Sequence, residues 1–150
     1  MTVQEKKEIQ NVIAQNEKYI LLVEDEPDIS QIQYSLLTQE PCNHQVDIAA
    51  NGQVAMEKID RNSYDFVSLD YMLPGKTNGM DVYHYIRKTN QTIPILFISG
   101  NLEFLESIKS LKKEDDYIDH LSKPCQNTDY VKCIHQLLDK GPGTRPFDLD

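Results

Sequence analysis

The stretch that decides the fold of this chain is residues 64–79, which read Tyr-Asp-Phe-Val-Ser-Leu-Asp-Tyr-Met-Leu-Pro-Gly-Lys-Thr-Asn-Gly. An apolar run over residues 66–69 ends abruptly at one acid, Asp70. A loop follows, and an amphipathic run opens at Gly79, so the pattern predicts a buried strand, a turn and a helix. In open α/β sheets, chemistry is found outside the carboxyl ends of the strands, where this pattern places Asp70. Taken alone, Asp70 is as readily a turn-forming acid as a functional one.

The same alternation of strand and helix extends along the rest of the chain. Apolar runs predict strands over residues 19–23, 66–69 and 95–98, the alternation of Val46, Ile48 and Ala50 predicts a short strand over residues 46–50, and a fifth strand is expected over residues 117–121. Each is followed by an apolar stripe with helical spacing. The stripes comprise Ile29, Ile32 and Leu36; Val54, Ala55 and Ile59; Val82, Tyr83 and Ile86; Leu102, Leu105, Ile108 and Leu111; and Val131, Ile134 and Leu138. We therefore predict an α/β fold, a flavodoxin-like doubly wound parallel sheet in strand order 2-1-3-4-5 with helices on both faces.

Composition limits the class of protein. The chain has 150 residues, 39% of them hydrophobic and 26% charged, which suits one globular domain. No apolar run approaches the roughly 20 residues of a membrane span, and the N-terminus lacks the apolar segment of a signal peptide. A cytoplasmic protein without membrane contact is the default expectation. The net charge of −9 argues against nucleic-acid binding by this segment and is compatible with cation binding.

The two ends of the chain read differently from its middle. Residues 1–17 form an N-terminal extension whose stripe of Val3, Ile9, Val12 and Ile13 suits a short amphipathic helix, with a frayed leader as the alternative. Residues 18–140 form the domain. Residues 141–150 begin Gly-Pro-Gly-Thr and read as a linker or tail.

The cysteines and most of the histidines carry no metal-site pattern. Cys42, Cys125 and Cys133 are odd in number and form no Cys-x-x-Cys pair, so we expect reduced, mostly buried thiols and no zinc site. His44, His84 and His135 read as ordinary surface or half-buried residues.

Charged and polar residues collect at the predicted carboxyl ends of four strands. Glu24 and Asp25 follow the first strand, Asp70 ends the third, Ser99 the fourth and Lys123 the fifth. Three carboxylates in one crevice repel one another unless a cation neutralises them, and hard oxygen ligands suit Mg²⁺. A lysine and a hydroxyl beside them could hold the oxygens of a transferred phosphoryl group.

At this point the sequence resembles the receiver domain of the response regulators of bacterial two-component signalling. The resemblance covers about residues 18–140. The residues that carry it are the acidic pair Glu24-Asp25, Asp70 with Leu73-Pro74 after it, Ser99, and Lys123-Pro124. They occur in the order and close to the spacing found in that family. Each motif alone is weak evidence, whereas all four in order, at the ends of the first, third, fourth and fifth strands, are specific.

The resemblance implies a phosphoprotein that carries Mg²⁺. Asp70 would be the phosphoacceptor. Asp25 would coordinate the metal directly, Glu24 mostly through water, and Met72 through its backbone carbonyl. Asp70 would also be a metal ligand.

The resemblance also assigns residues to the phosphoryl group. Ser99 would bind a phosphoryl oxygen, and Lys123 would pair with the group. Pro124 would follow a cis peptide bond, which is a modest cost before proline.

The partners follow from the same resemblance. A histidine kinase or a histidine phosphotransfer protein would donate the phosphoryl group, and the chain would be no enzyme apart from self-catalysed phosphotransfer to Asp70 and autodephosphorylation. The signal would leave through the face made by the helix over residues 102–111, the strand over 117–121 and the last helix. That face would present Phe104, His120 and Tyr130 to a partner, an output domain or a second copy of the chain. An output domain could follow residue 150, or the chain could be a single-domain regulator.

Two departures from the family pattern stand out. Gly79 follows Asp70 by nine residues where the family has eight, which leaves the conformation of the loop around residues 76–78 open. His120 stands three residues before Lys123, where the family commonly has a Tyr or Phe that turns as a switch. We expect His120 to act with Ser99 as a more polar switch.

Other interpretations remain. Glu24 and Asp25 could be solvated acids at a helix N-terminus, and Ser99 could simply cap the next helix. The main functional alternative is a pseudo-receiver that is never phosphorylated and acts as a protein-binding module. A hydrolase with Asp70 as nucleophile is a second alternative, although Asp70-Tyr71-Met72 lacks the second acid of an Asp-x-Asp signature.

Overall fold

The computed structural model describes residues 1–10 and 17–140 of the chain. The strands are β1 (Tyr19–Val23), β2 (Gln45–Ala49), β3 (Phe66–Asp70), β4 (Ile95–Ser99) and β5 (Ile118–Ser122). The helices are α1 (Val3–Gln10), α2 (Pro27–Thr38), α3 (Gly52–Arg61), α4 (Gly79–Thr89), α5 (Leu102–Leu111) and α6 (Asn127–Lys140).

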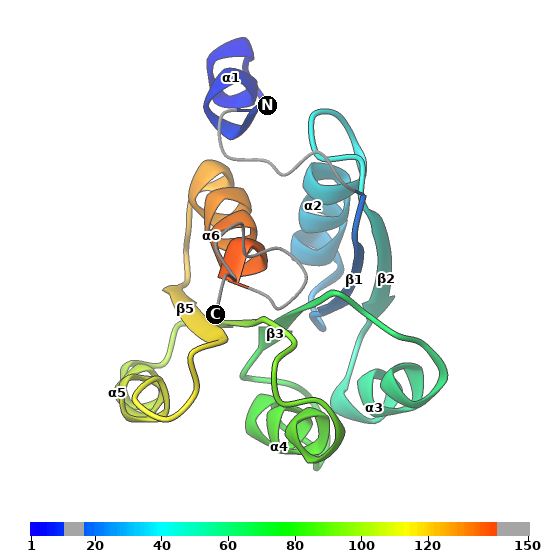
Figure 1. Cartoon of the computed structure of the whole chain (residues 1–150), viewed down its shortest axis with the longest axis vertical. Coiled ribbons are helices and arrows are strands. Elements are labelled where there is room, and N and C mark those ends of the chain that lie inside the picture. The colour runs from blue at the N-terminus through cyan, green and yellow to red at the C-terminus, as the bar shows by residue number, and fades with distance from the viewer. Residues whose placement is uncertain (11–16, 141–150) are drawn as a thin grey trace, which may run out of the picture.

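The five strands form one parallel sheet in the order β2-β1-β3-β4-β5, which confirms the predicted flavodoxin-like topology. Because parallel neighbours need a crossover, each strand is followed by a helix. Helices α3, α4 and α5 cover one face of the sheet, and α2 and α6 cover the other (Figure 1). All five carboxyl ends therefore meet at one edge of the sheet.

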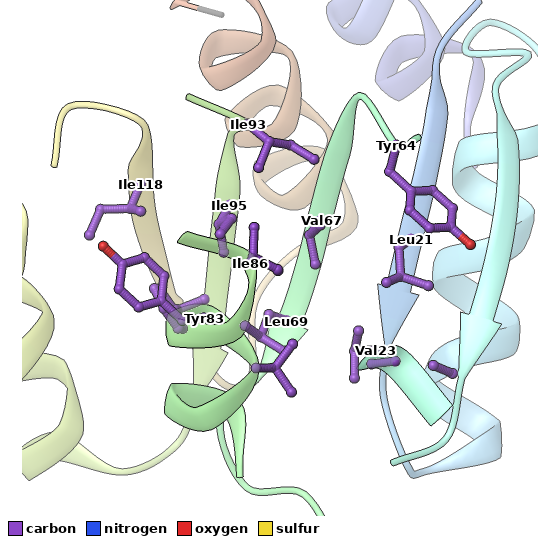
Figure 2. Close-up of a cluster of buried hydrophobic side chains, with 14 of the residues drawn as sticks. Leu21, Val23, Tyr64, Val67, Leu69, Tyr83, Ile86, Ile93, Ile95 and Ile118 are labelled. Atoms are coloured by element: carbon purple, nitrogen blue, oxygen red, sulfur yellow. The ribbon is translucent and has the colours of Figure 1, made fainter. Parts of the chain in front are cut away.

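The core lies in two apolar layers, one on each face. Alternate residues of the strands enter alternate layers, so Val67 and Leu69 of β3 pack toward α4 (Figure 2), whereas Phe66 packs toward α2 and α6. The central strands β3 and β4 are buried along their whole length. Their continuous apolar sequence reflects helices on both faces.

Several strand boundaries differ from the prediction by one residue. Strand β2 begins and ends one residue earlier, with the buried Ala49 as its last residue, so Ala50 lies outside it and is exposed. Strand β5 lies one residue later than predicted, and β3 and β4 each extend one residue further. These shifts lie within the usual uncertainty of element ends.

The predicted buried face of α2 is partly wrong. The residues that α2 buries are Ser30, Gln33, Leu36 and Leu37, whereas Ile32 is 53% exposed. The helix is therefore rotated relative to its predicted stripe, which places two small or polar side chains against the sheet. That rotation leaves Ile32 beside a groove between α2 and the start of α6.

The start of α5 also differs from the prediction. Leu102 is 76% exposed, and Phe104 takes the inward position together with Leu105 and Ile108. Leu102 is the first residue of the helix, where the chain has only just turned away from the sheet edge. The predicted inward residues of α4 and α6 are buried, as expected.

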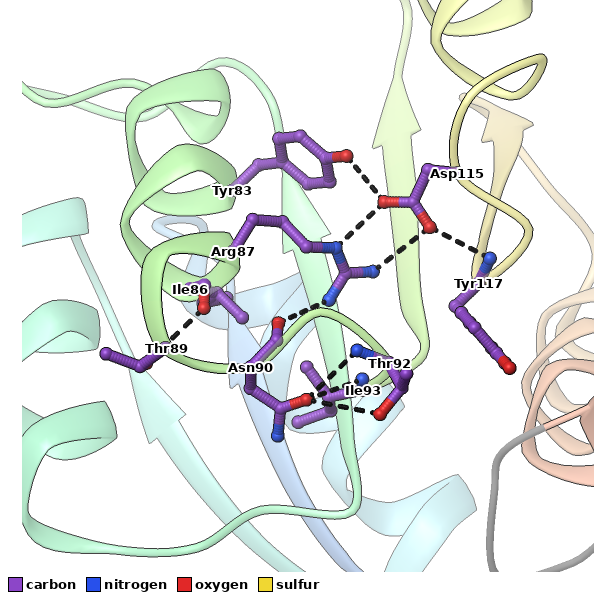
Figure 3. A network of polar contacts seen from close by, with 9 residues as sticks. All are labelled: Tyr83, Ile86, Arg87, Thr89, Asn90, Thr92, Ile93, Asp115 and Tyr117. Carbon is purple, nitrogen blue, oxygen red and sulfur yellow. Dashed lines mark hydrogen bonds and ion pairs between the residues drawn. The ribbon is translucent and has the colours of Figure 1, made fainter.

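A polar network on one side of the sheet ties α4 to the loop before β5 (Figure 3). The carboxylate of Asp115 accepts hydrogen bonds from the Tyr83 hydroxyl, the Arg87 guanidinium and the backbone N–H of Tyr117. Arg87 also donates to the carbonyl of Asn90 at the end of α4. The network lies near the amino ends of β4 and β5, at the edge of the sheet opposite to the one that carries Glu24, Asp25 and Asp70.

The predicted amphipathic N-terminal helix is observed over Val3–Gln10, and Val12 and Ile13 lie outside the described residues. Thr2 and Glu5 form a reciprocal capping box at its start. Ile9 is fully buried in the layer that contains α6, and Glu8 pairs with Lys132. The expected linker at residues 141–150 also lies outside the described part of the chain.

The prediction for two of the histidines is wrong. His44 and His135 are both buried and contact each other, because the segment just before β2 meets α6. His84 is exposed, as expected. The three cysteines are free thiols, and Cys42 and Cys133 are buried, as predicted for mostly buried thiols.

None of the helices within residues 1–10 and 17–140 combines the length and the apolar character that a bilayer crossing requires.

Candidate functional site

The carboxyl edge of the sheet brings three acids together. Glu24 and Asp25 follow β1 directly, and Asp70 is the last residue of the neighbouring β3. One carboxylate oxygen from each residue can be chosen so that all three lie within 4.8 Å of one another. Glu24 and Asp70 are only 2% and 3% exposed, whereas Asp25 is half-buried. Oxygen donors at this spacing suit a hard divalent cation such as Mg²⁺.

Lys123 joins this cluster from the end of β5. Its Nζ lies 3.0 Å from Asp70 Oδ2 and 3.0 Å from Glu24 Oε1. Partial burial alone would lower the pKa of Lys123, but the hydrogen bonds to Glu24 and Asp70 outweigh it and raise that pKa. The lysine is therefore held as a cation against two buried carboxylates.

Glu24 lies in a buried environment that disfavours its charged form. Burial raises its pKa to about 7, against the opposing effect of the hydrogen bond from Lys123. The nearby Asp70 also raises the pKa of Glu24. Its second oxygen accepts a hydrogen bond from the backbone N–H of Glu26 at the start of α2. Glu24 is thus engaged on both oxygens.

The loop after Asp70 accommodates the additional residue without moving Gly79 away from the acid. The carbonyl of Tyr71 accepts hydrogen bonds from the N–H groups of both Leu73 and Gly79. Asn78 then caps α4 through a capping box with Asp81. The extra residue is absorbed by the loop, and the helix begins directly against β3.

Gly79 has a steric reason to be glycine. A Cβ atom built there would lie 2.6 Å from the carbonyl oxygen of Asp70 and 2.7 Å from Tyr71 Cα, both of them backbone atoms. The backbone of Asp70 therefore depends on a residue without a side chain at this position. In the same loop, two residues after Asp70, the N–H of Met72 donates a hydrogen bond to Asp70 Oδ1 at 3.1 Å.

Ser99 is fully buried at the end of β4. Its Oγ accepts a hydrogen bond from the N–H of Asn101, and its carbonyl accepts one from the N–H of Lys123. Asn101, and not Ser99, caps α5 through the N–H of Phe104. The capping interpretation of Ser99 is therefore wrong, and the residue lies next to Lys123. The peptide bond between Lys123 and Pro124 is cis, as the resemblance implied.

His120 lies in β5 and is paired in register with Phe97 of β4. It therefore faces the layer under α5. Its Nδ1 is buried and has no hydrogen-bond partner among the described residues. Burial lowers the pKa of His120, with Lys112 acting in the same direction and Asp119 opposing.

The face formed by α5, β5 and α6 does not present the expected aromatic residues. Phe104 is buried and stacks on Tyr71 with ring centroids 3.5 Å apart. Tyr130 is buried on the other side of the sheet, where its hydroxyl donates to Ser68 Oγ. Among the three predicted residues, only His120 is partly exposed on this face. The stack of Tyr71 on Phe104 links the loop after Asp70 to α5, and no local pattern predicted it.

The comparisons with known proteins agree with this geometry. The family model for the response regulator receiver domain matches residues 20–135. The transcriptional regulatory protein TcrA of Mycobacterium tuberculosis is 34% identical over 131 residues, which is 87% of this chain and 50% of that protein. The response regulator ArlR of Staphylococcus saprophyticus is 32% identical over 130 residues, which is 87% of this chain and 56% of that protein. The chain thus spans about half the length of these curated relatives.

Solved structures show the same fold. The receiver domain of a Francisella response regulator has a TM-score of 0.69 and 24% identity, covering 83% of this chain and 98% of that one. A CheY-like receiver domain from Methanospirillum hungatei has a TM-score of 0.72 and 24% identity, covering 83% of this chain and 96% of that one. Together with the family match, these similarities show that the chain belongs to the response regulator receiver domain family.

Proposed function

We propose that this chain is a phosphoaspartate switch in which Asp70 accepts a phosphoryl group from a histidine kinase or a histidine phosphotransfer protein. The observation that carries the proposal is the position of Asp70, buried at a strand end between two further carboxylates and the Lys123 amine. Burying a carboxylate in that position costs free energy, which favours a functional role for its charge over a purely structural one. The membership of the family supports the same role.

The chemistry assigned to Asp70 is a displacement at phosphorus. A carboxylate oxygen of Asp70 forms the new bond to phosphorus, and the bond from phosphorus to the donor nitrogen breaks, leaving the donor imidazole. Lys123 is already within hydrogen-bond distance of Asp70 and can stabilise the negative charge on the oxygens of the transferred phosphoryl group. Ser99, buried beside Lys123, offers a hydroxyl to one of those oxygens.

The acidic residues fit Mg²⁺ as the cofactor. When bound, the ion would neutralise the clustered carboxylates and hold phosphoryl oxygens. Asp70 and Asp25 are assigned as direct ligands and the Met72 carbonyl as a further one. Glu24 is assigned to act through water, because its oxygens already accept hydrogen bonds from Lys123 and from the backbone of Glu26.

The output is assigned to the face of α5, β5 and α6. His120 is the one residue of the three expected there that is partly exposed, and its buried Nδ1 has no hydrogen-bond partner among the described residues, only a 3.8 Å contact with Asp119 Oδ1, so the ring is weakly held. Movement of Ser99 toward a phosphoryl group would open space next to β4, which His120 could enter. The face would then engage a partner, an output domain or a second copy of the chain. The net charge of −9 supports a protein partner over direct nucleic-acid contact by this segment.

We place the receiver domain at residues 18–140, the N-terminal extension at 1–17 and the tail at 141–150. Apart from phosphotransfer to Asp70 and its reversal by hydrolysis, we assign the chain no enzyme activity. The family match over residues 20–135 supports these boundaries.

One experiment separates this function from its alternatives. The protein is incubated with Mg²⁺ and acetyl phosphate, and its intact mass and the phosphate released are followed over time. A single phosphoryl adduct that persists for minutes supports the switch. Absence of an adduct with folded protein would indicate a binding module, and continued release of phosphate over many turnovers would indicate a hydrolase.

A further inference from the structure

Tyr71, the residue that follows Asp70, is fixed in place by its backbone. Its N–H donates to the carbonyl of Ile98 in β4, and its own carbonyl accepts two further backbone hydrogen bonds. Its ring stacks on that of Phe104 in α5, with the centroids 3.5 Å apart and an angle of 22° between the planes. The side chain next to the acceptor thus contacts the helix whose face is assigned to the output.

Phe104 is also linked to Ser99 by a second route. Its N–H donates to Asn101 Oδ1, the cap of α5, and the N–H of Asn101 donates to Ser99 Oγ. Its ring packs edge-on against Phe97, which is paired in register with His120 of β5. A movement of the Ser99 hydroxyl would therefore displace Phe104 and disturb the layer that His120 faces.

The first turn of α5 has little other attachment to the core. Leu102, its first residue, is 76% exposed, and Glu103 is exposed as well, so Phe104 is the first buried residue of the helix. Dispersion contact falls steeply with distance, and a gap of about 0.5–1 Å between two surfaces loses about a quarter to a half of it. The stack on Tyr71 therefore resists any movement of this turn away from the loop after Asp70.

We propose that Tyr71 is a positioning residue whose ring holds Phe104, and with it the first turn of α5, in the unphosphorylated position. Occupation of Asp70 then has to displace Phe104 from this stack before His120 responds. This inference rests on the proposed phosphoaspartate switch and adds a regulatory contact between the acceptor and α5. An aromatic pair changes an equilibrium by about two- to tenfold, so removal of the Tyr71 ring should favour the displaced position by that factor.

The test compares the wild type with Tyr71→Leu, which removes the ring, and with Tyr71→Phe, which keeps it. The ¹⁵N-labelled full chains are titrated with beryllofluoride in the presence of Mg²⁺, and the amide shifts of residues 99–105 and 118–122 are followed by NMR. In free Tyr71→Leu, these shifts should lie on the line between the free and the bound wild type, displaced toward the bound end. The affinity of Tyr71→Leu for beryllofluoride should rise by the same factor, about two- to tenfold, because binding and displacement are linked.

Two control variants should match the wild type in free shifts and in affinity. Tyr71→Phe retains the stack, and Tyr34→Leu removes a tyrosine that is 37% exposed on α2. A merely structural role of Tyr71 would give a different result, since a loosened loop moves the shifts off that line and leaves the affinity unchanged or lower. Such a result would contradict the proposal.

Phe104→Leu removes the other ring of the stack. Tyr71→Leu combined with Phe104→Leu should bind beryllofluoride no more tightly than Phe104→Leu alone, because the stack is already lost. Additive gains in affinity would show that the two rings act separately and would also contradict the proposal.

Failure of this coupling and failure of the proposed function give different results. If the wild type binds beryllofluoride and Tyr71→Leu matches it in free shifts and in affinity, the coupling is overturned and the switch stands. If the wild type shows neither beryllofluoride shifts nor a phosphoryl adduct, the proposed function is overturned and the coupling with it.

Discussion

The Nε2 atoms of His44 and His135 lie 2.8 Å apart in the interior of the protein. His44 Nδ1 accepts a hydrogen bond from the backbone N–H of Lys18, so its proton is on Nε2 and is donated to His135. His135 Nδ1 carries its own proton and donates to the carbonyl of Val131. The chain of three bonds is complete with both rings neutral, and an additional proton would place two donors against each other.

The histidine pair predicts a loss of stability in mild acid. Burial lowers the pKa of His44 to about 4 and also lowers that of His135. Between the ordinary value of about 6.5 and the lowered values, the unfolded chain binds protons that the folded protein does not. The contribution of the pair to the free energy of unfolding should therefore fall as pH drops below about 6.5, whereas Glu24, whose pKa burial raises to about 7, acts in the opposite direction. We expect the pair to contribute a loss of about 2 kcal/mol between about pH 7.5 and about pH 5, measured by urea unfolding as the difference between the wild type and a variant without the pair.

A double variant isolates this effect from other titrating groups. His44→Leu with His135→Leu should make the protein lose less stability, or gain more, than the wild type as pH falls across that range, whereas His84→Gln, at an exposed position on α4, should follow the wild type. An equal pH dependence in the wild type and the double variant would show that the pair is not responsible.

Gly79 should not tolerate a side chain. Gly79→Ala is expected to destabilise the protein by about 1–3 kcal/mol, because the new Cβ would overlap the backbone of Asp70 and Tyr71. Gly100→Ala is the control, since its Cβ would meet nothing closer than 3.9 Å. Thermal or urea unfolding compares the two, and a Gly79→Ala protein as stable as Gly100→Ala would contradict the observed approach of α4 to β3.

Mg²⁺ should stabilise the folded chain, because it offsets the repulsion among Glu24, Asp25 and Asp70. At a concentration about 100-fold above its dissociation constant, a ligand bound only by the native state contributes about 2.7 kcal/mol. Thermal melts with and without Mg²⁺ measure this. The shift should vanish in Asp25→Ala and persist in Asp28→Ala, whose acid is exposed on the first turn of α2. An undiminished shift in Asp25→Ala would place the ion elsewhere.

His120 should change its environment on activation. Burial lowers the pKa of His120 in the present state. NMR titration of its ring, with and without beryllofluoride as a phosphoryl mimic, should give two different pKa values if the ring moves between buried and exposed positions. Asp70 should still be phosphorylated in His120→Ala, because we assign His120 to respond to phosphorylation and not to take part in the phosphotransfer. Identical pKa values and ring contacts in both states would exclude the switch role.

The strands and the acidic site could be predicted because their signals are local. Strands β1, β3 and β4 are mostly continuous apolar runs, and the edge strands β2 and β5 keep apolar residues at alternate or scattered positions. Parallel topology brings every strand end to one edge, so Asp25, Asp70 and Lys123 were expected to approach one another. The conformation of the loop before Gly79 could not be predicted, because its closure depends on two hydrogen bonds to one carbonyl, that of Tyr71.

The orientation of the helices and the long-range polar contacts were harder to predict from the sequence. The apolar stripe of α2 is wide enough to allow more than one rotation, and the structure buries Gln33 where the pattern favoured Ile32. His44 and His135 are 91 residues apart in the chain, so neither has a neighbour that signals the pair. Phe104 is buried against Phe97 and against Tyr71 of a separate loop, contacts that the local sequence does not signal.

The central claim is that Asp70 carries the phosphoryl group, and direct localisation tests it. Wild type, Asp70→Asn and Asp28→Asn are each incubated with Mg²⁺ and acetyl phosphate, and the phosphoryl group is mapped by peptide mass spectrometry. We predict a single modified peptide containing Asp70 in the wild type and in Asp28→Asn, and no modification in folded Asp70→Asn. Labelling of Asp70→Asn at the wild-type rate, or a phosphoryl group mapped to another residue, would contradict the assignment.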